Sequence, residues 1–324
     1  MKIKIKYTVE FEKILGSMHF ESQHLTPTDF QGPAPMQIDP IEITRNRINL
    51  QQSLDSEEHD KKLLADQLAN YCKLFDVLFQ EISRNSHKKM KSIPLFSWQV
   101  DDEEIISSCW KVEQIIPKVL LSRLFLESGH SALPNYKLAS INYGKAITTH
   151  EQIKKNLSNW KWRNPDMNHT VLQDDWHDSC IAHLQSLQHM AMLSKGIENK
   201  LPSKTLCTVS ERAVKSSVCS IAKWTSNYEP ENTLPACQAI QMYYSSKLLW
   251  DDAKYGHSIY RLQKLHDSNF TEKTKFEAIN GELEKVGFLL SENKRTNNGA
   301  YFDTVEMGEP LKSALEIFEG LCIQ

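Results

Sequence analysis

The first eleven residues alternate apolar and polar side chains. Apolar residues stand at every second position from Ile3 to Phe11, and lysines, a threonine and a glutamate fill the positions between them. A period of two puts the apolar side chains on one face, so the pattern predicts a half-buried β-strand over residues 2–11. The stretch 22–41 then holds four of the twelve prolines, which predicts a loop or an extended segment.

From about residue 43 onward the apolar positions recur with the spacing of an α-helix. The clearest example is 58–84, where one stripe is formed by Leu63, Leu64, Leu68, Tyr71, Leu74, Phe75, Leu78 and Phe79. Periodicity and breaking residues predict further helical segments at 102–129, 135–160, 171–199, 203–226, 233–270 and 271–296. The sequence Lys254-Tyr255-Gly256 marks a turn that divides the 233–270 segment into two antiparallel helices.

These patterns predict the fold class. Successive antiparallel helices bury their apolar stripes against their neighbours, as in tetratricopeptide-like solenoids, although no strict repeat of about 34 residues is present. We therefore expect a mostly α-helical, irregular solenoid with a small N-terminal β element. We expect a single domain over 1–324, with a strand and proline-rich region at 1–42, a helical body at 43–305 and a C-terminal tail at 306–324.

Composition and charge narrow the functional class. The net charge of −3 gives no general attraction to nucleic acid, so we expect no nucleic-acid binding. The seven cysteines contain no Cys-x-x-Cys pair, and the N-terminus lacks the continuous apolar run of a signal peptide. No stretch reaches about 18 apolar residues, the length that predicts a membrane-spanning helix. We expect a cytoplasmic protein with reduced thiols.

The best candidate for a metal site lies in the predicted helix 171–199. His177, Cys180 and His183 follow the spacing i, i+3, i+6. A step of six residues turns a side chain by about 240° around a helix, so the three do not converge easily, and histidines with ordinary helix partners are the better interpretation. No Gly-rich phosphate loop, Gly-x-Ser-x-Gly or His-Glu-x-x-His motif occurs. We expect no metal, no cofactor and no enzymatic activity.

Three strings of the sequence follow one another in the order and spacing of a known family. They are FSWQVD at 96–101, KYGHSIYRLQ at 254–263 and NNGAYFDTV at 297–305. They resemble the Phe-x-Trp opening, the Tyr-Gly-Glu-x-Ile-x-Arg-Leu-Gln signature and the Asn-Asp-x-Ile-Tyr-His-Asp-x-Val segment of the Bro domain family, which includes Alix, Brox and HD-PTP-like proteins. This resemblance covers roughly residues 70–305 and implies a curved, boomerang-shaped helical solenoid. The second string is also a simple packing code for two helices that meet at a turn, with Gly256 allowing close approach.

The resemblance implies a function. It implies a non-enzymatic adaptor of the endosomal sorting (ESCRT) pathway, which forms multivesicular bodies. Such an adaptor docks peripherally on the endosomal membrane and binds the C-terminal amphipathic helix of an ESCRT-III subunit in a groove. The competing interpretation is a helical-repeat scaffold unrelated to endosomes, which would keep the same helix pattern but bind no ESCRT-III helix.

The predicted groove departs from the family pattern. In the family it uses an acidic residue before one helix and three large apolar residues on the next two helices. Here those positions are occupied by Leu133, Ala191, Lys204 and Thr208. None keeps the family's residue type, and a lysine opposes the same ligand unless it pairs with one of the ligand's acids. Two explanations stay open: the alignment is displaced by one residue, which brings in Met192 and Thr205, or the partner has changed.

The C-terminal sequence bears on membrane attachment. Brox-like members of the family carry a prenylation box whose cysteine is the fourth residue from the end. In this chain Cys322 is the third residue from the end, in Leu-Cys-Ile-Gln. We therefore expect no lipid anchor.

Overall fold

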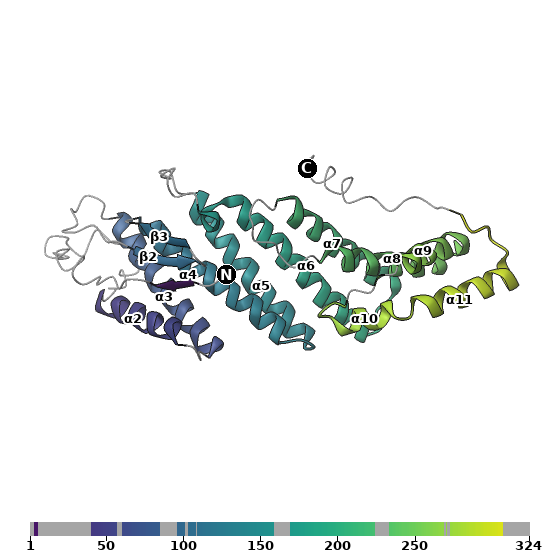
Figure 1. The fold of residues 1–324 in the computed structure, drawn as a ribbon, viewed down its shortest axis with the longest axis horizontal. Coiled ribbons are helices and arrows are strands. Elements are labelled where there is room, and N and C mark those ends of the chain that lie inside the picture. Colours follow the sequence, from purple (N-terminus) through teal and green to yellow (C-terminus); the bar gives the residue numbers. More distant parts are fainter. Residues whose placement is uncertain are drawn as a thin grey trace, which may run out of the picture. The chain divides into compact units, whose positions relative to one another are not determined.

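The computed structural model describes a defined part of the chain: residues 3–5, 40–56, 60–84, 96–100, 103–107, 109–158, 169–223, 233–268, 270 and 273–306. The chain falls into two compact units. Figure 1 labels most of their helices and strands. Unit 1 comprises Met1–Leu124 and Gln152–Leu172, and unit 2 comprises Phe125–Glu151 and Gln173–Gln324. The single domain expected over 1–324 stays a prediction. Most of the predicted strand, most of the predicted loop 22–41, Asp101 and the tail beyond Glu306, with Cys322, lie outside the described residues.

Among the described residues, unit 1 contains one antiparallel sheet in the order β1-β2-β3. Its strands are β1 (Ile3–Ile5), β2 (Phe96–Val100) and β3 (Glu103–Ser107). Trp98 on the central strand stands opposite Ile5 on one side and Ile105 on the other. The predicted N-terminal strand is therefore confirmed over these three residues. It lies at the edge of the sheet beside β2, and β2 and β3 form a hairpin.

The helices of unit 1 follow the predicted pattern with small shifts at their ends. They are α2 (Pro40–Asp55), α3 (Lys61–Arg84), the first part of α4 (Trp110–Ser131), the end of α5 (Tyr136–Ser158) and the 3-10 helix η1 (Thr170–Leu172). The predicted helices at 58–84 and 135–160 are thus confirmed. α2 begins inside the predicted loop, at Pro40, because proline already has the backbone angle of a first helical residue.

The prediction of one helix over 102–129 is wrong at its start. Residues 103–107 form β3, and α4 begins only at Trp110. Within β3 Ile105 is buried and Ile106 is exposed, which is the two-residue period of a strand. Five residues carry too little pattern to distinguish a strand from the start of a helix, so the hairpin was not predicted.

A buried ion pair lies at the centre of unit 1. Arg47 on α2 and Glu113 on α4 pair with their side chains completely buried. Tyr71 on α3 donates its hydroxyl to the same carboxylate, and the Trp98 indole N–H donates to its other oxygen at 2.6 Å. Burial raises the pKa of Tyr71 well above its ordinary value, so the hydroxyl keeps the proton that it donates. One carboxylate therefore connects α2, α3, α4 and the sheet.

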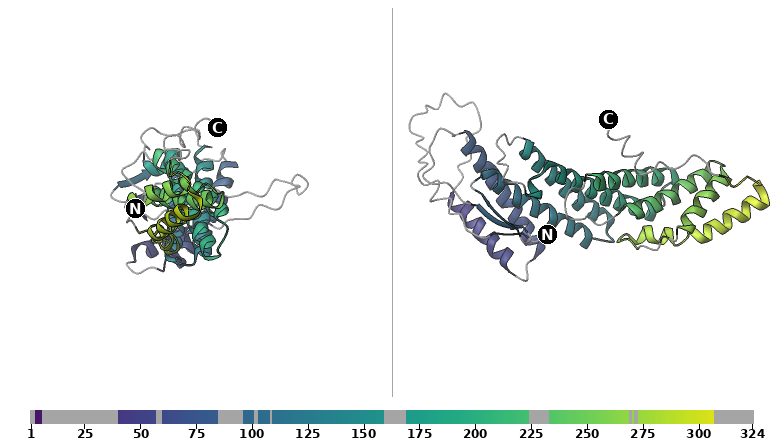
Figure 2. Two further views of the ribbon diagram at one scale, coloured as in Figure 1. Left: turned by 90° about the vertical axis from the view of Figure 1, so that its right-hand side faces the viewer. Right: turned by 45° about the horizontal axis from the view of Figure 1, so that its top comes forward.

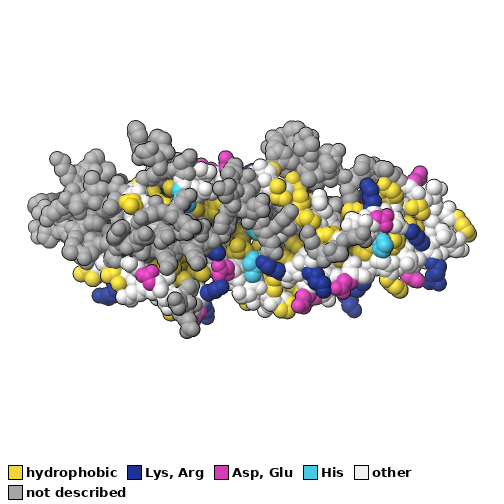
Figure 3. Space-filling view, in the orientation of Figure 1, with side chains coloured by type: hydrophobic (Ala, Val, Ile, Leu, Met, Phe, Trp, Pro, Cys, Tyr) yellow, Lys and Arg dark blue, Asp and Glu magenta, His cyan; other side chains and the backbone are white. Residues whose placement is uncertain are grey.

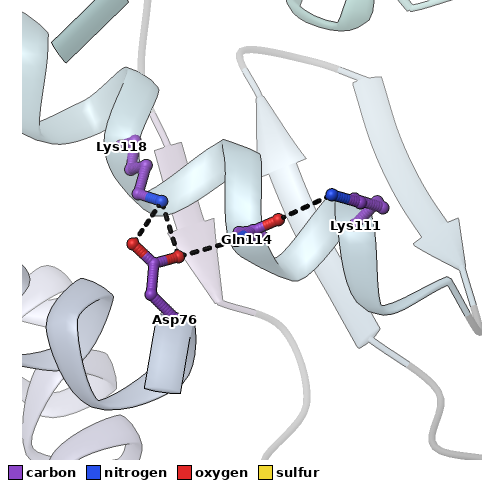
Figure 4. Close-up of polar contacts among 4 residues, drawn as sticks. All are labelled: Asp76, Lys111, Gln114 and Lys118. Atoms are coloured by element: carbon purple, nitrogen blue, oxygen red, sulfur yellow. Dashed lines mark hydrogen bonds and ion pairs between the residues drawn. The ribbon is translucent and has the colours of Figure 1, made fainter. Parts of the chain in front are cut away.

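A second polar cluster joins α3 to α4 nearer the surface (Figure 4). The buried Lys118 ammonium lies 2.7 Å from both carboxylate oxygens of Asp76, and the Gln114 amide donates to the same aspartate at 2.7 Å. Lys111 donates to Gln114 at 3.2 Å and lies 4.6 Å from the ring centre of Phe79. Partial burial, with the charge of Lys118, lowers the pKa of Lys111. Asp76 thus neutralises a lysine that has almost no access to water.

Unit 2 is a succession of helices that pack on their neighbours. After the start of α5 come α6 (Asp174–Glu198), α7 (Ser203–Ala222), α8 (Leu234–Asp251), α9 (Tyr255–Asp267), α10 (Glu277–Leu283), α11 (Val286–Thr296) and the π-helix η2 (Asn297–Tyr301). From α6 (teal) to α9 (green) each helix contacts the next one, as both views show (Figures 1 and 2). The predicted turn at 254–256 is confirmed, since α8 and α9 are separate helices.

The prediction of one helix over 271–296 is wrong, because the structure has the two helices α10 and α11 there. The start of α10 is delayed by side-chain hydrogen bonds between Thr274 and Asn280. The Thr274 hydroxyl donates to the Asn280 side-chain oxygen at 2.9 Å, and the Asn280 amide donates to the Thr274 carbonyl at 2.9 Å. Such local bonds compete with the helical ones, so the helix begins at Glu277.

A buried hydroxyl cluster fixes the register of three helices in unit 2. Ser186 on α6 lies 2.6 Å from Ser217 on α7, and Thr233, just before α8, lies 2.8 Å from Ser217 and 3.1 Å from Ser186. The Cys237 sulfur on α8 completes the cluster at 3.5 Å from Ser217. Because buried hydroxyls need partners, sliding one helix along another would leave these groups unsatisfied.

The second and third strings of the family resemblance meet in space at the end of unit 2. The Gly256 N–H donates to the Asp303 carboxylate at 2.8 Å. The Asn297 side-chain amide donates to the Asp303 carbonyl at 2.7 Å, and its oxygen accepts from the Asp303 N–H at 3.0 Å. A Cβ atom on Gly256 would lie 1.8 Å from the Thr304 carbonyl oxygen. We name this contact the Gly256 clasp. Glycine is required there because any side chain would collide with the backbone that follows η2.

We expect Glu113→Gln to lower the free energy of unfolding by about 3–5 kcal/mol, because it removes the buried negative charge that pairs with the Arg47 guanidinium. Urea unfolding followed by circular dichroism measures this. Glu42→Gln, an exposed glutamate on α2, is the control and should change stability by less than about 0.5 kcal/mol. Equal urea midpoints for the two variants would contradict the central role of Glu113.

We expect Gly256→Ala to destabilise unit 2 by about 2 kcal/mol or more, since the Thr304 backbone must move away from the new methyl group. The matched control is Gly281→Ala on α10, where an added Cβ meets nothing within 4 Å. That change should be neutral or stabilise by up to about 1 kcal/mol. Thermal unfolding compares the two, and hydrogen exchange at residues 301–306 should accelerate only in Gly256→Ala.

Candidate partner-binding face

The four predicted groove residues all lie in unit 2, but only two of them are exposed. Lys204 and Thr208 lie one turn apart on the exposed side of α7, and Leu133 is half-buried in the turn between α4 and α5. Ala191 on α6 is 0% exposed and packs in the core of the unit. A side chain without exposed area cannot contact a partner, so Ala191 contributes to packing.

The displaced alignment gives a different set on the same helices. Met192 is 47% exposed, although it follows the fully buried Ala191. Thr205, next to Lys204, is exposed as well. One residue along a helix turns the side chain by about 100°, which is enough to move it from the core to the surface. Of the two explanations left open by the sequence, the displaced alignment is the one that places an apolar side chain on the surface.

Side-chain contacts show that the exposed sides of α5, α6 and α7 are continuous. The Gln188 amide on α6 donates to the Ser140 carbonyl on α5 at 3.2 Å. About 100° further around α6, His189 lies 3.4 Å from the Ser216 hydroxyl on α7. Met192 lies on the helix stripe between these two contacts, so it stands in the middle of a surface bordered by α5 and α7.

We name this surface the α5–α7 face. Its members are exposed or half-buried side chains of the three helices: Lys137, Ile141, Gln188, Met192, Lys204, Thr205, Thr208 and Arg212. Ile141, at 47% exposure, provides further apolar area on α5. Figure 3 shows apolar side chains interspersed with both basic and acidic ones on one side of the molecule. The face therefore offers a small apolar centre with charged surroundings.

The histidines of the predicted metal candidate have other roles. His177 is fully buried, and its Nδ1 lies 2.8 Å from Nδ1 of His150 on α5, so one ring donates and the other accepts. Trp176 packs its ring against both imidazoles. Burial raises the pKa of the Cys180 thiol and keeps it protonated. In the part of the chain that the structure describes, no group of three or more His, Cys, Asp or Glu side chains could hold a metal ion.

One residue was not identified from the sequence: His150 as the partner of His177. Met192 was identified only as the alternative that a displaced alignment brings in, although the helical phase of α6 favours its exposure, because the residues three to four positions before it, Gln188 and His189, are polar. His150 could not be found from such a pattern, because its position depends on how α5 and α6 are aligned in space. No pattern within one helix contains that alignment.

The sequence matches no protein-family model and no curated protein. Solved structures do match. A crystal structure of ALIX in complex with the SIVmac239 PYKEVTEDL late domain superposes with a TM-score of 0.73 at 16% identity, covering 96% of this chain and 46% of the ALIX chain. The ALIX BRO1 CHMP4C complex superposes with a TM-score of 0.71 at 15% identity, covering 97% of this chain and 91% of that one. A structure titled as the basis for endosomal targeting by the Bro1 domain gives 0.69 at 14% identity, with coverages of 97% and 88%.

The chain has the Bro1-domain fold. The fold class predicted from the sequence, mostly helical with a small β element, is thereby confirmed, and so is the likeness to Bro domains. The chain spans 46% of the ALIX chain in the first of these structures, and nearly all of the Bro1-domain chains in the other two. At 14–16% identity the likeness establishes the fold, and the function of this Bro1-fold chain has to be argued from its own residues.

We expect the stability of the protein to fall as the pH drops below about 6.5. Burial, with the adjacent His177 ring, lowers the pKa of His150 well below its usual range. The unfolded chain therefore binds a proton that the folded chain excludes, and stability falls by up to about 1.4 kcal/mol per pH unit for each such histidine. Above about pH 7 both states are neutral at this site, and the histidine adds no pH dependence.

Urea unfolding between pH 8 and pH 5 measures this effect. His150→Gln should reduce the slope of stability against pH below 6.5 relative to the wild-type protein. An identical slope in the wild-type protein and His150→Gln would contradict the assignment.

Proposed function

We propose that this Bro1-fold chain is a non-enzymatic adaptor of the endosomal sorting pathway, working as one domain over residues 1–324. It binds the C-terminal amphipathic helix of an ESCRT-III subunit on the α5–α7 face. Met192 enters the partner's apolar seam, and Thr205, Thr208 and Lys204 border the bound helix. Leu133 lies at the start of α5, beside the end of this face.

The observation that carries the proposal is the exposure of Met192 between two flanking helices. Exposing a large apolar side chain to water is unfavourable, and exposed apolar side chains that stand together commonly mark partner sites. Ile141 on α5 is another large apolar side chain that is exposed, at 47%. A helix that lies across α5, α6 and α7 can bury Met192 and Ile141 with residues at i, i+3 and i+4 spacing.

The similar structures support the same class of partner. One of them is a complex of the ALIX BRO1 domain with CHMP4C, and another is titled for endosomal targeting by the Bro1 domain. Within the described residues, none of the helices has the length and apolar character needed to cross a membrane. We propose a cytoplasmic protein that reaches endosomes by peripheral contact.

We expect the chain to bind at least one ESCRT-III C-terminal helix with a Kd on the order of 1–100 µM, as measured by fluorescence anisotropy of labelled peptides. Met192→Asp should weaken binding by about tenfold or more, because burying a methionine stabilises by about 1.5–3 kcal/mol and a buried carboxylate adds a desolvation cost.

The matched control is Ile221→Asp. Ile221 is 46% exposed, close to the exposure of Met192, and lies at the other end of α7, about 20 Å along the helix from Thr208. It should bind like the wild-type protein. Failure of every ESCRT-III helix to bind the folded wild-type chain would contradict the proposal. The alternative, a helical-repeat scaffold that binds another partner, would then be favoured. Equal losses in both variants would move the binding site away from Met192.

A further inference from the structure

Lys111 in unit 1 is a lysine whose positive charge has little support from its surroundings (Figure 4). It is half-buried at the start of α4, and its ammonium lies 4.6 Å from the ring centre of Phe79. Its hydrogen bond goes to the neutral side-chain oxygen of Gln114. Among the residues that the structure describes, no carboxylate forms an ion pair with it, and the carboxylate of this cluster, Asp76, is bound by Lys118.

Two effects disfavour the charged form of this lysine. Partial burial removes water from the ammonium, and Lys118 places a second positive charge in the same cluster. Cys109 and Asp76 act in the opposite direction with smaller effects. The pKa of Lys111 is lowered as a result, so near neutral pH a larger fraction of it is the neutral amine. The neutral amine is the form that attacks electrophiles.

A chain of hydrogen bonds fixes the direction of the amine. The Gln114 side-chain amide donates to Asp76 on α3 at 2.7 Å, so the oxygen of the same amide is directed to Lys111. That oxygen accepts one N–H of the amine at 3.2 Å. Gln114 is only 7% exposed, which leaves it little freedom to turn. A neutral amine held through one N–H keeps its lone pair available for a reaction.

A free thiol stands near this amine. Cys109 lies two residues before Lys111, is half-buried, and forms no disulfide. It influences the charge of Lys111, so the two groups lie within electrostatic range of each other. A thiolate attacks the carbonyl carbon of a thioester readily. A thiol next to a partly neutral amine is therefore suited to receive an acyl group and to pass it on.

From this arrangement we propose that Lys111 is a site of acylation by acyl thioesters, and that Cys109 receives the acyl group first. The Cys109 thiolate attacks the thioester carbonyl, and the thiolate of the donor leaves. The neutral Lys111 amine then attacks the same carbonyl carbon. A C–N bond forms, the C–S bond to Cys109 breaks, the sulfur leaves as a thiolate, and the nitrogen releases a proton to water.

The cluster tolerates this modification and makes it selective. Acylation removes the charge of Lys111 and with it the repulsion from Lys118, while the ion pair between Lys118 and Asp76 remains. The ring of Phe79 offers an apolar neighbour to the acyl group. Lys118 itself is 4% exposed and bound to a carboxylate, so it is protected from the same reagent. The inference concerns unit 1 and stands independently of the function proposed for unit 2.

The test treats the full chain with the acetyl thioester of N-acetylcysteamine and follows each lysine by mass spectrometry of its peptides. At about pH 8 we expect the initial rate at Lys111 to exceed that at Lys73, an exposed lysine on α3, by about fivefold or more. Lys118 should react more slowly than both. A rate at Lys111 equal to or below that at Lys73 would overturn the proposal.

Lys118→Met tests the electrostatic basis. It removes the like charge and leaves Asp76 free to pair with Lys111, so the rate at Lys111 should fall by about threefold or more. Circular dichroism verifies that the variant is folded. An unchanged rate in the folded variant contradicts the role given to the cluster.

Cys109→Ser tests the acyl donor, at a half-buried position where a small change is well tolerated. The rate at Lys111 should fall by about threefold or more with the thioester. It should stay the same with acetic anhydride, which reacts with amines directly. Equal thioester rates in the wild-type protein and Cys109→Ser would overturn the transfer through Cys109.

Discussion

The fixed register of α6 between its neighbours is the constraint on which the candidate site depends. The hydroxyls of the buried Ser186 and Ser217 and of the half-buried Thr233 satisfy one another only when α6, α7 and the start of α8 are aligned in one way. Small side chains at this contact also let the helices approach closely. Because α6 is covered on both flanks, only one narrow stripe of it stays exposed. The position of Met192 on that stripe follows from the packing of polar groups on the opposite side of the helix.

Most of the helical body could be predicted from the sequence, because amphipathic periodicity over 15 residues or more has few competing interpretations. α3, α5, α7 and the division between α8 and α9 were found from apolar stripes and breaking residues. The hairpin β2–β3 was missed, since Ile105 and Ile106 look the same in a short apolar run until the sheet buries one of them. The division of 271–296 into α10 and α11 was missed, and so was the later start of α10, which depends on the side-chain bonds of Asn280.

The site was harder to predict than the fold. The resemblance to Bro domains indicated the correct helices, but a displacement by one residue exchanges a core alanine for a surface methionine. Ala191 and Met192 are adjacent in the sequence and differ greatly in exposure. Only the structure shows which of the two side chains faces the core and which faces the solvent. The position of charged residues near Met192 could not be predicted from the sequence either, since Lys137 and Arg212 are 75 residues apart in the chain. The structure brings their helices to either side of α6.

The Gly256 clasp closes a loop of the chain that runs from the start of α9 to the residues after η2. Closing this loop has one entropic cost, and the contacts of all the helices inside the loop then form without a further cost of the same kind. α9, α10 and α11 are consequently linked in their opening, because releasing the clasp at Asp303 frees both ends of the loop together. In terms of local stability, the last part of unit 2 behaves as one cooperative folding unit. A single glycine and a single aspartate thereby set whether the end of this domain is rigid or frays helix by helix.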